Sequence, residues 1–314
     1  MAVAFVFPGQ GSQSVGMGKA LADAFPVAAR VFAEIDAALD EPLTPTMWNG
    51  PADRLTLTEN TQPALVAVSL AAIAVLEREA GLDLARDAQF VAGHSVGEYA
   101  ALAATGAISI TDAARLVRTR GLAMARAVPA GHGAMAALLG VDFELAAAIA
   151  AEAAEGQVCQ AANDNGGGQV VVSGDKAAVE RAVAIAKHKG VRRAMMLPVS
   201  SAFHSALMQP AAAVMREALA AVTIKPPVVP LVANVLARAT SDPQEIARGL
   251  VEQVTGNVRW RESITYMAAA GVTTFYEVGS GKVLSGLTKR IVEGASGISI
   301  GTPEEVAAFK AARG

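Results

Sequence analysis

Apolar runs and stretches of helical periodicity alternate along most of this chain of 314 residues. Residues 2–7 are continuously apolar and end at Pro8-Gly9, which predicts a buried strand. Residues 89–92 predict a second short strand. Such alternation is typical of an α/β core around a parallel sheet. The other elements predicted for this core are helices over residues 20–39, 64–80, 98–105, 111–127, 208–219, 242–253 and 282–291, a helix after Trp260, strands over 228–234, 273–278 and 298–300, and a last helix that begins at 303.

Three helix starts have local signals. Pro63 is expected in the first turn of the helix that continues over 64–80. The N–H groups of a first turn have no partner within the helix, so a proline is tolerated there. Asp112 is interpreted as the N-cap of the helix that begins at Thr111. Thr302-Pro303-Glu304-Glu305 has the pattern of a capping box and predicts the start of the last helix.

The middle of the chain has a different order of elements, strand–helix–strand–strand–helix–strand, which is the ferredoxin-like arrangement. The predicted strands cover residues 134–139, 158–162, 169–173 and 191–197, the helices 143–154 and 176–189, and a turn 163–168. We therefore predict an α/β-hydrolase-like catalytic domain, made of residues 1–129 and 199–314, with a ferredoxin-like subdomain over residues 130–198 inserted into it.

Composition narrows the classes of function. Hydrophobic residues make up 53% of the chain and charged residues 18%, enough apolar material for a large core. The net charge of −3 and the lack of a basic run argue against a nucleic-acid-binding protein. A single cysteine, Cys159, excludes an internal disulfide and a cysteine-based zinc site. The longest apolar stretch, residues 64–76, is too short to span a bilayer, and we expect a cytoplasmic protein.

Gly93-His94-Ser95-Val96-Gly97 lies between a predicted strand and a predicted helix. A serine in the pattern G-x-S-x-G at that place is typical of a nucleophile elbow. The turn is so tight that side chains two residues to either side would collide, which accounts for both glycines. The helix that follows provides N–H donors where an oxyanion would develop. A chance match in a glycine-rich chain is the alternative.

A nucleophilic serine needs a base, and the chain has four histidines. His94 is adjacent to Ser95 and would diverge from it around the turn, while His188 ends a helix and His132 lies between two glycines. His204 follows the predicted insert, where the catalytic domain resumes, and is our candidate base; a loop histidine without chemistry is the alternative. No aspartate between Ser95 and His204 stands out as a third member, which favours a Ser–His dyad.

Arg120 follows the elbow by one helix. Arg115, Arg118 and Arg120 cannot all face the same way on a helix. A buried guanidinium would require an anionic partner. Spacing alone leaves open the alternative of three solvated arginines.

Taken together, the motifs resemble those of the malonyl-CoA:acyl carrier protein transacylases of fatty acid synthesis. The resemblance covers nearly the whole chain and five or more motifs occur in the family's order. They are Phe7-Pro8-Gly9-Gln10-Gly11-Ser12-Gln13, Asn60-Thr61-Gln62-Pro63-Ala64, the elbow with Glu98-Tyr99, Arg120-Gly121 followed by residues 124–129, Ala202-Phe203-His204-Ser205, and residues 277–284.

The resemblance implies a role for each matching residue. Ser95 would carry the acyl group as an ester and His204 would be the general base and then the acid. The backbone N–H groups of Gln10 and Val96 would form the oxyanion hole. Arg120 would bind the free carboxylate of malonyl, and a backbone carbonyl near Gln253 would orient the histidine. The remaining residues expected to contact substrate are Gln62, Met124, Asn163 and Phe203.

The implied reaction needs no cofactor. Malonyl-CoA is the expected donor substrate, and acyl carrier protein is the expected acceptor and protein partner. Phe203 is expected to fill the space that the α-methyl group of methylmalonyl would need. Because acyl carrier protein is acidic, we expect a basic docking face. Its candidates are Lys187, Lys189, Arg192 and Arg193 on the insert and Lys282, Lys289 and Arg290 on the main domain.

Three other functions remain open at this point. A serine thioesterase or hydrolase would use the same elbow with water as the acceptor. The malonyltransferase of a malonate decarboxylase or of a polyketide synthase would use the same chemistry with another carrier. A non-catalytic interaction protein is the third alternative, and the joint presence of Ser95, His204 and Arg120 argues against it.

Overall fold

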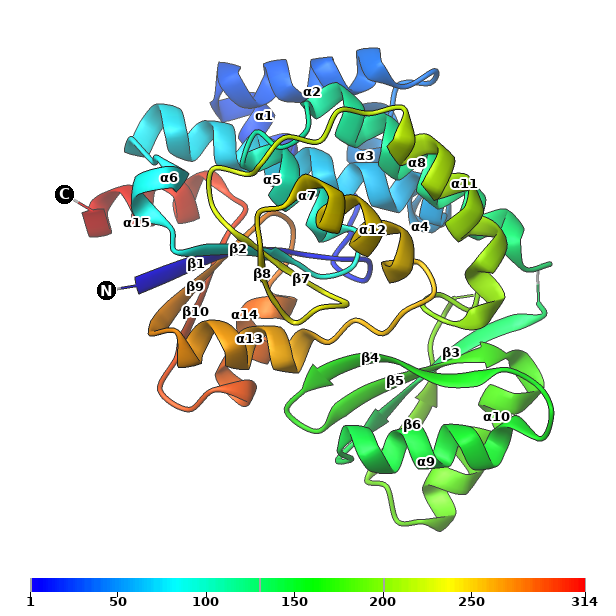
Figure 1. Ribbon diagram of the computed structural model, residues 1–314. Helices are drawn as coiled ribbons and strands as arrows, with labels where there is room; N and C mark the ends of the chain where they lie inside the picture. Colours follow the sequence, from blue (N-terminus) through cyan, green and yellow to red (C-terminus); the bar gives the residue numbers. More distant parts are fainter. Residues whose placement is uncertain (1, 130, 200, 314) are drawn as a thin grey trace.

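A six-stranded sheet forms the centre of the larger part of the molecule in the computed structural model, which describes residues 2–129, 131–199 and 201–313 (Figure 1). The strands lie in the order β10-β9-β1-β2-β7-β8, and all neighbours are parallel except β7 and β8. Their bounds are β1 Ala2–Phe7, β2 Phe90–Gly93, β7 Leu231–Ala233, β8 Arg238–Thr240, β9 Val272–Val278 and β10 Ser296–Ile300. The expected α/β core with a parallel sheet is therefore confirmed.

Helices cover both faces of this sheet, with α13 and α14 on one side and most of the others on the opposite side (Figure 1). The alternation of side chains along β1 shows the two cores: Phe5 and Phe7 pack into one cluster, and Ala4 and Val6 into another. A strand buried on both faces has no polar positions, which explains its continuous apolar run. The helices of this part are α1 Lys19–Ala24, α2 Pro26–Ala38, α3 Thr44–Asn49, α4 Ala52–Thr56, α5 Thr58–Ala80, α6 Leu84–Asp87, α7 Gly97–Ala104, α8 Ile110–Ala127, the 3-10 turn η1 Ala206–Met208, α11 Gln209–Ala220, α12 Pro243–Gln253, α13 Trp260–Ala269, α14 Val283–Ile291 and α15 Pro303–Arg313.

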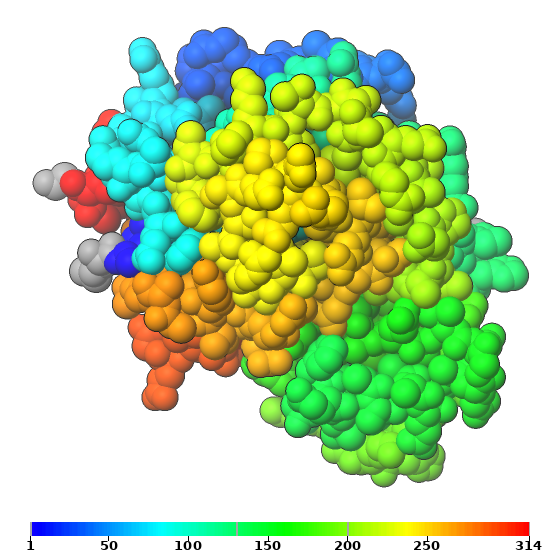
Figure 2. Space-filling model, viewed as in Figure 1, coloured from blue at the N-terminus to red at the C-terminus, as the bar shows by residue number. Residues whose placement is uncertain are grey.

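The middle of the chain folds into a separate four-stranded antiparallel sheet with two helices, and forms a distinct lobe in the space-filling view (Figure 2). The strand order β4-β5-β3-β6 is that of the expected ferredoxin-like arrangement. Its elements are β3 Gly133–Leu139, α9 Phe143–Ala154, β4 Cys159–Gly166, β5 Gln169–Asp175, α10 Lys176–His188 and β6 Arg193–Met196. The predicted boundary at residue 130 lies outside the described residues, and the division into domains stays a proposal.

Strand β4 is hydrogen-bonded to the larger part of the molecule at Val258, between α12 and α13. The N–H of Val258 donates to the carbonyl of Ala162 at 2.9 Å, and the N–H of Asp164 donates to the carbonyl of Val258 at 3.0 Å. Nδ2 of Asn257 adds a bond to the carbonyl of Ala161 at 3.0 Å. These contacts fix the β4–β5 hairpin beside the carboxyl ends of the parallel strands.

Several predicted helix limits are wrong. The helix expected over residues 20–39 is two helices, because Phe25 is extended and Pro26 starts α2. Pro63 lies inside α5 and not in its first turn. The carbonyl of Glu59, to which a proline cannot donate, accepts instead from Nη1 of Arg118 at 2.7 Å, and the helix begins at Thr58, six residues before its predicted start.

Two further local predictions are corrected. The N-cap of α8 is Ser109, whose hydroxyl accepts from the N–H of Asp112 at 3.0 Å, so Asp112 is inside the first turn. The predicted turn at residues 163–168 is shorter, because β4 continues to Gly166 and only Gly167 and Gly168 connect it to β5. Helices α3, α4 and α6 and strand β8 were not predicted from the sequence.

Candidate active site

Ser95 lies at the tip of the turn between β2 and α7, with a φ of 52°. A Cβ atom at Gly93 would lie 1.9 Å from the carbonyl carbon of Gly97, and one at Gly97 would lie 2.2 Å from the carbonyl oxygen of Phe7. Both glycines are therefore required by the close approach of backbone to backbone, as expected for an elbow. The strained left-handed backbone of Ser95 directs its hydroxyl away from the turn.

Asn234, in the segment after β7, braces the elbow from the side. Its Oδ1 accepts from the N–H of Ser95 at 2.8 Å, and its Nδ2 donates to the carbonyl of Gly93 at 2.6 Å. One buried side chain thus satisfies a donor and an acceptor of the turn that the strained backbone leaves unpaired. Sequence reasoning missed this residue, since it lies 139 positions from Ser95 and belongs to no recognised motif.

His204 is the histidine that faces the serine, with its Nε2 2.8 Å from Oγ of Ser95. Its Nδ1 lies 2.8 Å from the carbonyl oxygen of Gln253. Because a carbonyl can only accept, Nδ1 carries the proton in the neutral ring and Nε2 is free to accept from the serine. Burial, together with the positive charge of Arg120, lowers the pKa of His204 to about 3. The ring of His204 is therefore neutral at physiological pH.

Arg120, on α8, is 2% exposed and its guanidinium ends beside Ser95. Nη1 donates to Oε1 of Gln62 at 2.7 Å, and Nη2 donates to Oε1 of Gln253 at 2.9 Å and to Oγ of Ser95 at 3.0 Å. All three acceptors are neutral, and within the described residues no carboxylate pairs with this guanidinium. Burial lowers its pKa from the ordinary value. The result is a buried cation whose charge is available to an acidic ligand.

Two backbone N–H groups flank the serine from the elbow and from the loop after β1. The N–H of Val96 is at the N-terminus of α7, and Gly9 packs so closely on the carbonyl of His94 that a Cβ there would lie 2.5 Å from it. This contact packs the loop that contains Gln10 against the elbow, and Oγ1 of Thr58 donates to Oε1 of Gln10 at 3.0 Å. In the described part of the chain, neither N–H has a protein acceptor. Gln10 and Val96 both line the cavity of Ser95, and their role as an oxyanion hole stays a prediction.

One cavity of about 340 Å³ joins the predicted site residues. Ser95, His204, Arg120, Gln10 and Val96 line it, and Gln253 lies behind the serine and the histidine. The four other predicted substrate contacts also line this cavity: Gln62, Met124, Asn163 and Phe203. The structure therefore brings together residues from both parts of the molecule, with Asn163 from β4 and the rest from the larger part.

The chain is similar to known acyltransferases. The acyl transferase domain family matches residues 4–302. The malonyl CoA-acyl carrier protein transacylase of Bacillus subtilis (strain 168) is 47% identical over 305 residues, 97% of this chain and 95% of that protein. The chain belongs to the malonyl-CoA:acyl carrier protein transacylases.

Solved structures of other transacylases agree with the fold. The acyl-carrier-protein-S-malonyltransferase from Bartonella henselae is 54% identical with a TM-score of 0.97, over 100% of this chain and 99% of that one. A malonyl-transacylase solved in complex with a type II polyketide synthase acyl-carrier protein is 40% identical with a TM-score of 0.95, over 99% and 100%. The similarity thus includes both the parallel sheet and the four-stranded subdomain of this transacylase.

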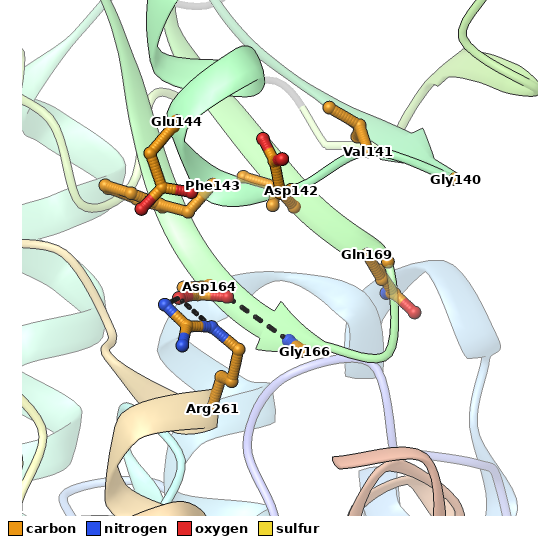
Figure 3. Close-up of a pocket in the computed structure, with 11 residues that line it drawn as sticks. Gly140, Val141, Asp142, Phe143, Glu144, Asp164, Gly166, Gln169 and Arg261 are labelled. Carbon is orange, nitrogen blue, oxygen red and sulfur yellow. Dashed lines mark hydrogen bonds and ion pairs between the residues drawn. The ribbon is translucent and has the colours of Figure 1, made fainter.

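A second cavity, of about 480 Å³, lies on the other side of β4 (Figure 3). Asn163 and Asn165 line the cavity that contains Ser95, whereas Asp164 lines the second one, as the alternation of side chains along a strand predicts. In Figure 3, Asp164 and Arg261 point toward each other, and their ion pair measures 2.8 Å. The pair ties the subdomain to α13 and has no contact with the reacting groups.

The ring of His94 contacts the subdomain. The side chain is half-buried and its Nε2 lies 2.9 Å from Oδ1 of Asn165, on β4 of the subdomain. Burial lowers the pKa of His94, so that the ring is neutral. The interaction places the tip of the β4–β5 hairpin over the elbow, a role that sequence reasoning did not identify.

Glu98, one turn after Ser95 on α7, is the other unexpected group of the site, and it is only 2% exposed. Burial raises the pKa of this carboxyl to about 8, although the N–H of Asn234, the amide of Gln253 and the charge of Arg120 act in the opposite direction.

Among the described residues, no cluster of histidine, cysteine, aspartate and glutamate side chains could hold a metal ion. No helix of the described chain is long and apolar enough to cross a membrane.

Of the seven basic residues predicted for carrier docking, two form ion pairs and two lie at the end of α14. Lys189 pairs with Glu152 at 3.0 Å and Lys282 pairs with Glu305 at 3.0 Å, so part of their charge is balanced locally. Lys289 and Arg290 form the last turn of α14, and three residues of this helix, Val283, Leu284 and Leu287, line the cavity of Ser95. The basic end of α14 therefore belongs to the helix that borders the cavity.

Proposed function

We propose that this chain performs the reaction of its family through Ser95, His204 and Arg120. It is an acyltransferase, an [acyl-carrier-protein] S-malonyltransferase of fatty acid biosynthesis, with malonyl-CoA and acyl carrier protein as its substrates. The observation that supports the assignment of residues is the buried Arg120, whose Nη2 lies 3.0 Å from Oγ of Ser95 and whose acceptors among the described residues are all neutral. A malonyl ester on Ser95 would present a carboxylate to that cation.

In the first half of the reaction, Oγ of Ser95 attacks the thioester carbonyl of malonyl-CoA, and its proton passes to Nε2 of His204. The N–H groups of Gln10 and Val96 stabilise the oxyanion of the tetrahedral intermediate. The intermediate collapses, the carbon–sulfur bond breaks, and CoA leaves as the thiol with the proton from His204. The malonyl group stays on Ser95 as an oxygen ester, with its carboxylate on Arg120.

In the second half, the phosphopantetheine thiol of acyl carrier protein attacks the malonyl ester. His204 takes the thiol proton and returns it to Oγ of Ser95 as the ester bond breaks. The backbone carbonyl of Gln253 holds the ring in one tautomer in both halves, in place of a carboxylate. The overall mechanism is ping-pong, with the malonyl-serine ester as its covalent intermediate.

Suppression of hydrolysis distinguishes a transferase from a hydrolase with the same elbow. Ser95 and His204 are 9% and 5% exposed, and the subdomain closes one side of their cavity. A narrow cavity of this kind limits the access of water to the ester while a thiol on a flexible arm can enter. We therefore favour transfer over hydrolysis.

The acceptor is expected to dock at the edge of the cavity that α14 borders. Its basic residues Lys289 and Arg290 suit an acidic carrier, and a relative of 40% identity has been solved in complex with an acyl-carrier protein.

We also propose that the enzyme works in the cytoplasm, because its one cysteine, Cys159, is a buried free thiol and the chain relies on no disulfide.

Mass spectrometry of the intact protein after incubation with malonyl-CoA tests this function. The wild type should gain the mass of one malonyl group and lose it when acyl carrier protein with its phosphopantetheine arm is added. Ser95→Ala should gain none.

Release of free malonate without an acyl-enzyme would instead indicate a thioesterase. A stable malonyl ester that acyl carrier protein cannot discharge would point to another carrier, such as that of a malonate decarboxylase or a polyketide synthase.

A further inference from the structure

Glu98 has both carboxyl oxygens directed at N–H donors of the active site. Oε1 accepts from the backbone N–H of Asn234 at 2.5 Å, and Oε2 accepts from Nε2 of Gln253. Asn234 is the residue that braces the elbow, and Gln253 is the residue whose carbonyl holds His204. A buried carboxylate is costly unless its interactions compensate, and the mechanism above gives this one no role.

The side-chain amide of Gln253 connects Glu98 to the cation. Its Oε1 accepts from Nη2 of Arg120 at 2.9 Å, while its Nε2 donates to the carbonyl of Ser95 at 2.9 Å and to Glu98. An amide has an acceptor end and a donor end. If this amide turned by half a rotation, its NH₂ group would face the N–H of Arg120 and its oxygen would face the carbonyl of Ser95, and both contacts would become repulsive.

We propose that Glu98 is a positioning residue for malonyl recognition, whose carboxylate holds the amide of Gln253 in the orientation that gives Arg120 an acceptor. This proposal rests on the function proposed above. Gln62 and Gln253 then fix the plane of the guanidinium from two sides without neutralising it. The cation stays oriented and charged for the carboxylate of the acyl group.

The geometry explains why an ionised carboxylate is needed at position 98 and an amide would fail. The N–H of Asn234 belongs to the backbone and cannot turn, so the single oxygen of a substituted amide would pair with it. The NH₂ group of that amide would then face Gln253, whose own amide must turn to offer an oxygen. Arg120 would lose one of its two glutamine acceptors.

Protonation of Glu98 should have the same effect as this substitution, since a carboxylic acid also has one donor and loses one acceptor. Burial raises the pKa of Glu98 to about 8. The charged and titratable groups that act on it are Arg120 on α8 and its neighbour Tyr99 on α7, while His204 reaches it only through Gln253. Malonyl recognition should therefore strengthen as the pH rises through this pKa and the carboxyl ionises.

Steady-state kinetics of Glu98→Gln and of the wild type between pH 6.5 and 9 test the proposal, at about half-unit intervals of pH. At the upper end, the variant should have a KM for malonyl-CoA about tenfold above that of the wild type, as expected for the loss of one hydrogen bond to a charged group. Its kcat should stay within about threefold, because the backbone carbonyl of Gln253 still holds His204. The wild-type KM should fall as the pH rises, and that of the variant should not change.

Glu277→Gln is the matched control. Glu277 is also buried, and its two oxygens accept from the N–H groups of Leu284 and Ser285 at 3.0 and 2.7 Å. The chemical change is the same, but it lies outside the network of Arg120. This variant should lose thermal stability and keep the wild-type KM and its dependence on pH.

Two results overturn the proposal: a folded Glu98→Gln variant with the wild-type malonyl KM, or one whose KM keeps the wild-type dependence on pH. If the variant does not fold, Gln253→Ala decides: it keeps the backbone carbonyl that holds His204 but removes the amide that Glu98 orients, so the malonyl KM should rise by a similar factor, and a wild-type KM contradicts the proposal. Failure of the proposed function is a different observation, namely a wild-type enzyme that forms no malonyl ester on Ser95.

Discussion

Arg120 donates a hydrogen bond from Nη2 to Oγ of Ser95 at 3.0 Å, and the same oxygen lies 2.8 Å from Nε2 of His204. The nucleophile thus stands between its base and a buried cation. A hydroxyl oxygen can accept from the guanidinium while it donates to the histidine, and the positive charge favours the oxygen as it loses its proton. The residue proposed to recognise the acyl carboxylate is therefore also in contact with the oxygen that attacks.

Arg120→Ala should change the preference for acyl groups. Loss of a charge-assisted, bidentate interaction should reduce kcat/KM for malonyl-CoA by about 100-fold, which corresponds to about 3 kcal/mol. The rate with acetyl-CoA, which has no carboxylate to bind, should fall much less, so that the malonyl-to-acetyl ratio collapses. Rates with both thioesters, measured by the release of CoA, check this.

Arg118→Ala is the control for that experiment, because Arg118 is on the same helix and, among the described residues, bonds only to Glu59 and Asn60. It should cost about 1–2 kcal/mol of stability and leave the malonyl-to-acetyl ratio unchanged. A wild-type ratio in Arg120→Ala would remove the assignment of Arg120 as the carboxylate-binding residue.

The pKa of His204, lowered to about 3, predicts how the rate of acylation depends on pH. A histidine with an ordinary pKa would lose half of its base at about pH 6.5. Here the neutral form should persist, so formation of the malonyl ester should show no loss of base between pH 7 and 5. Because Arg120 contributes to the low pKa, Arg120→Ala should move the loss of activity toward higher pH. Rapid-quench measurement of the ester checks both statements, and a wild-type midpoint near pH 6.5 would contradict them.

Much of the catalytic chemistry could be predicted from short motifs, whereas the support around it could not. Ser95 and His204 occur in local patterns that have a physical reason, and they meet as expected. Asn234 has no such pattern, and its contact with Ser95 spans 139 positions. Gln253 was predicted only for its backbone carbonyl, although its side chain links Arg120, Ser95 and Glu98. Polar networks of this kind depend on tertiary contacts, which a single sequence does not encode in its local spacing.

The errors in secondary structure have a similar origin. Pro63 was expected to mark a helix start because a proline removes an N–H group. The prediction was wrong, since Arg118 from another helix satisfies the carbonyl of Glu59 that the proline leaves free. The number of strands and helices in the ferredoxin-like subdomain was predicted correctly, because its periodicity is local and its turns contain glycine.

Asn234→Ala should weaken the hydrogen bonding that holds the turn around Ser95 in place. The substitution leaves the N–H of Ser95 and the carbonyl of Gly93 without partners in a turn with a φ of 52°. We expect kcat for malonyl transfer to fall by about 10- to 100-fold, because a small displacement of the nucleophile is enough for such a loss. Labelling of Ser95 by a fluorophosphonate should slow by a similar factor. Asn257→Ala, which removes a bond to the carbonyl of Ala161, should leave this labelling rate unchanged.

Charge reversal at the end of α14 should affect only the carrier protein. The double variant Lys289→Glu/Arg290→Glu should raise the KM for acyl carrier protein by about tenfold at low salt, and the effect should shrink as the ionic strength rises. The KM for malonyl-CoA should not change. Lys310→Glu is the control, since α15 lies at the opposite end of the molecule from the subdomain (Figure 1). Equal changes in the KM of both substrates would refute carrier docking on this helix.

Phe203→Ala tests how the cavity selects the acyl group. Phe203 is largely buried, lines the cavity of Ser95 and precedes His204 directly. If its ring occupies the space that an α-methyl group needs, a smaller side chain should raise kcat/KM for methylmalonyl-CoA relative to malonyl-CoA by about 10- to 100-fold, since one methyl group is worth about 1–3 kcal/mol of discrimination. Competition between the two thioesters, read from the mass of the acyl-enzyme, measures the ratio directly. Met124→Ala enlarges the cavity beside Gln62 instead, where the two side chains are in contact, and serves as the matched control. A methylmalonyl fraction that rises equally in both variants would mean that cavity volume, and not the place of Phe203 next to the histidine, sets the selectivity.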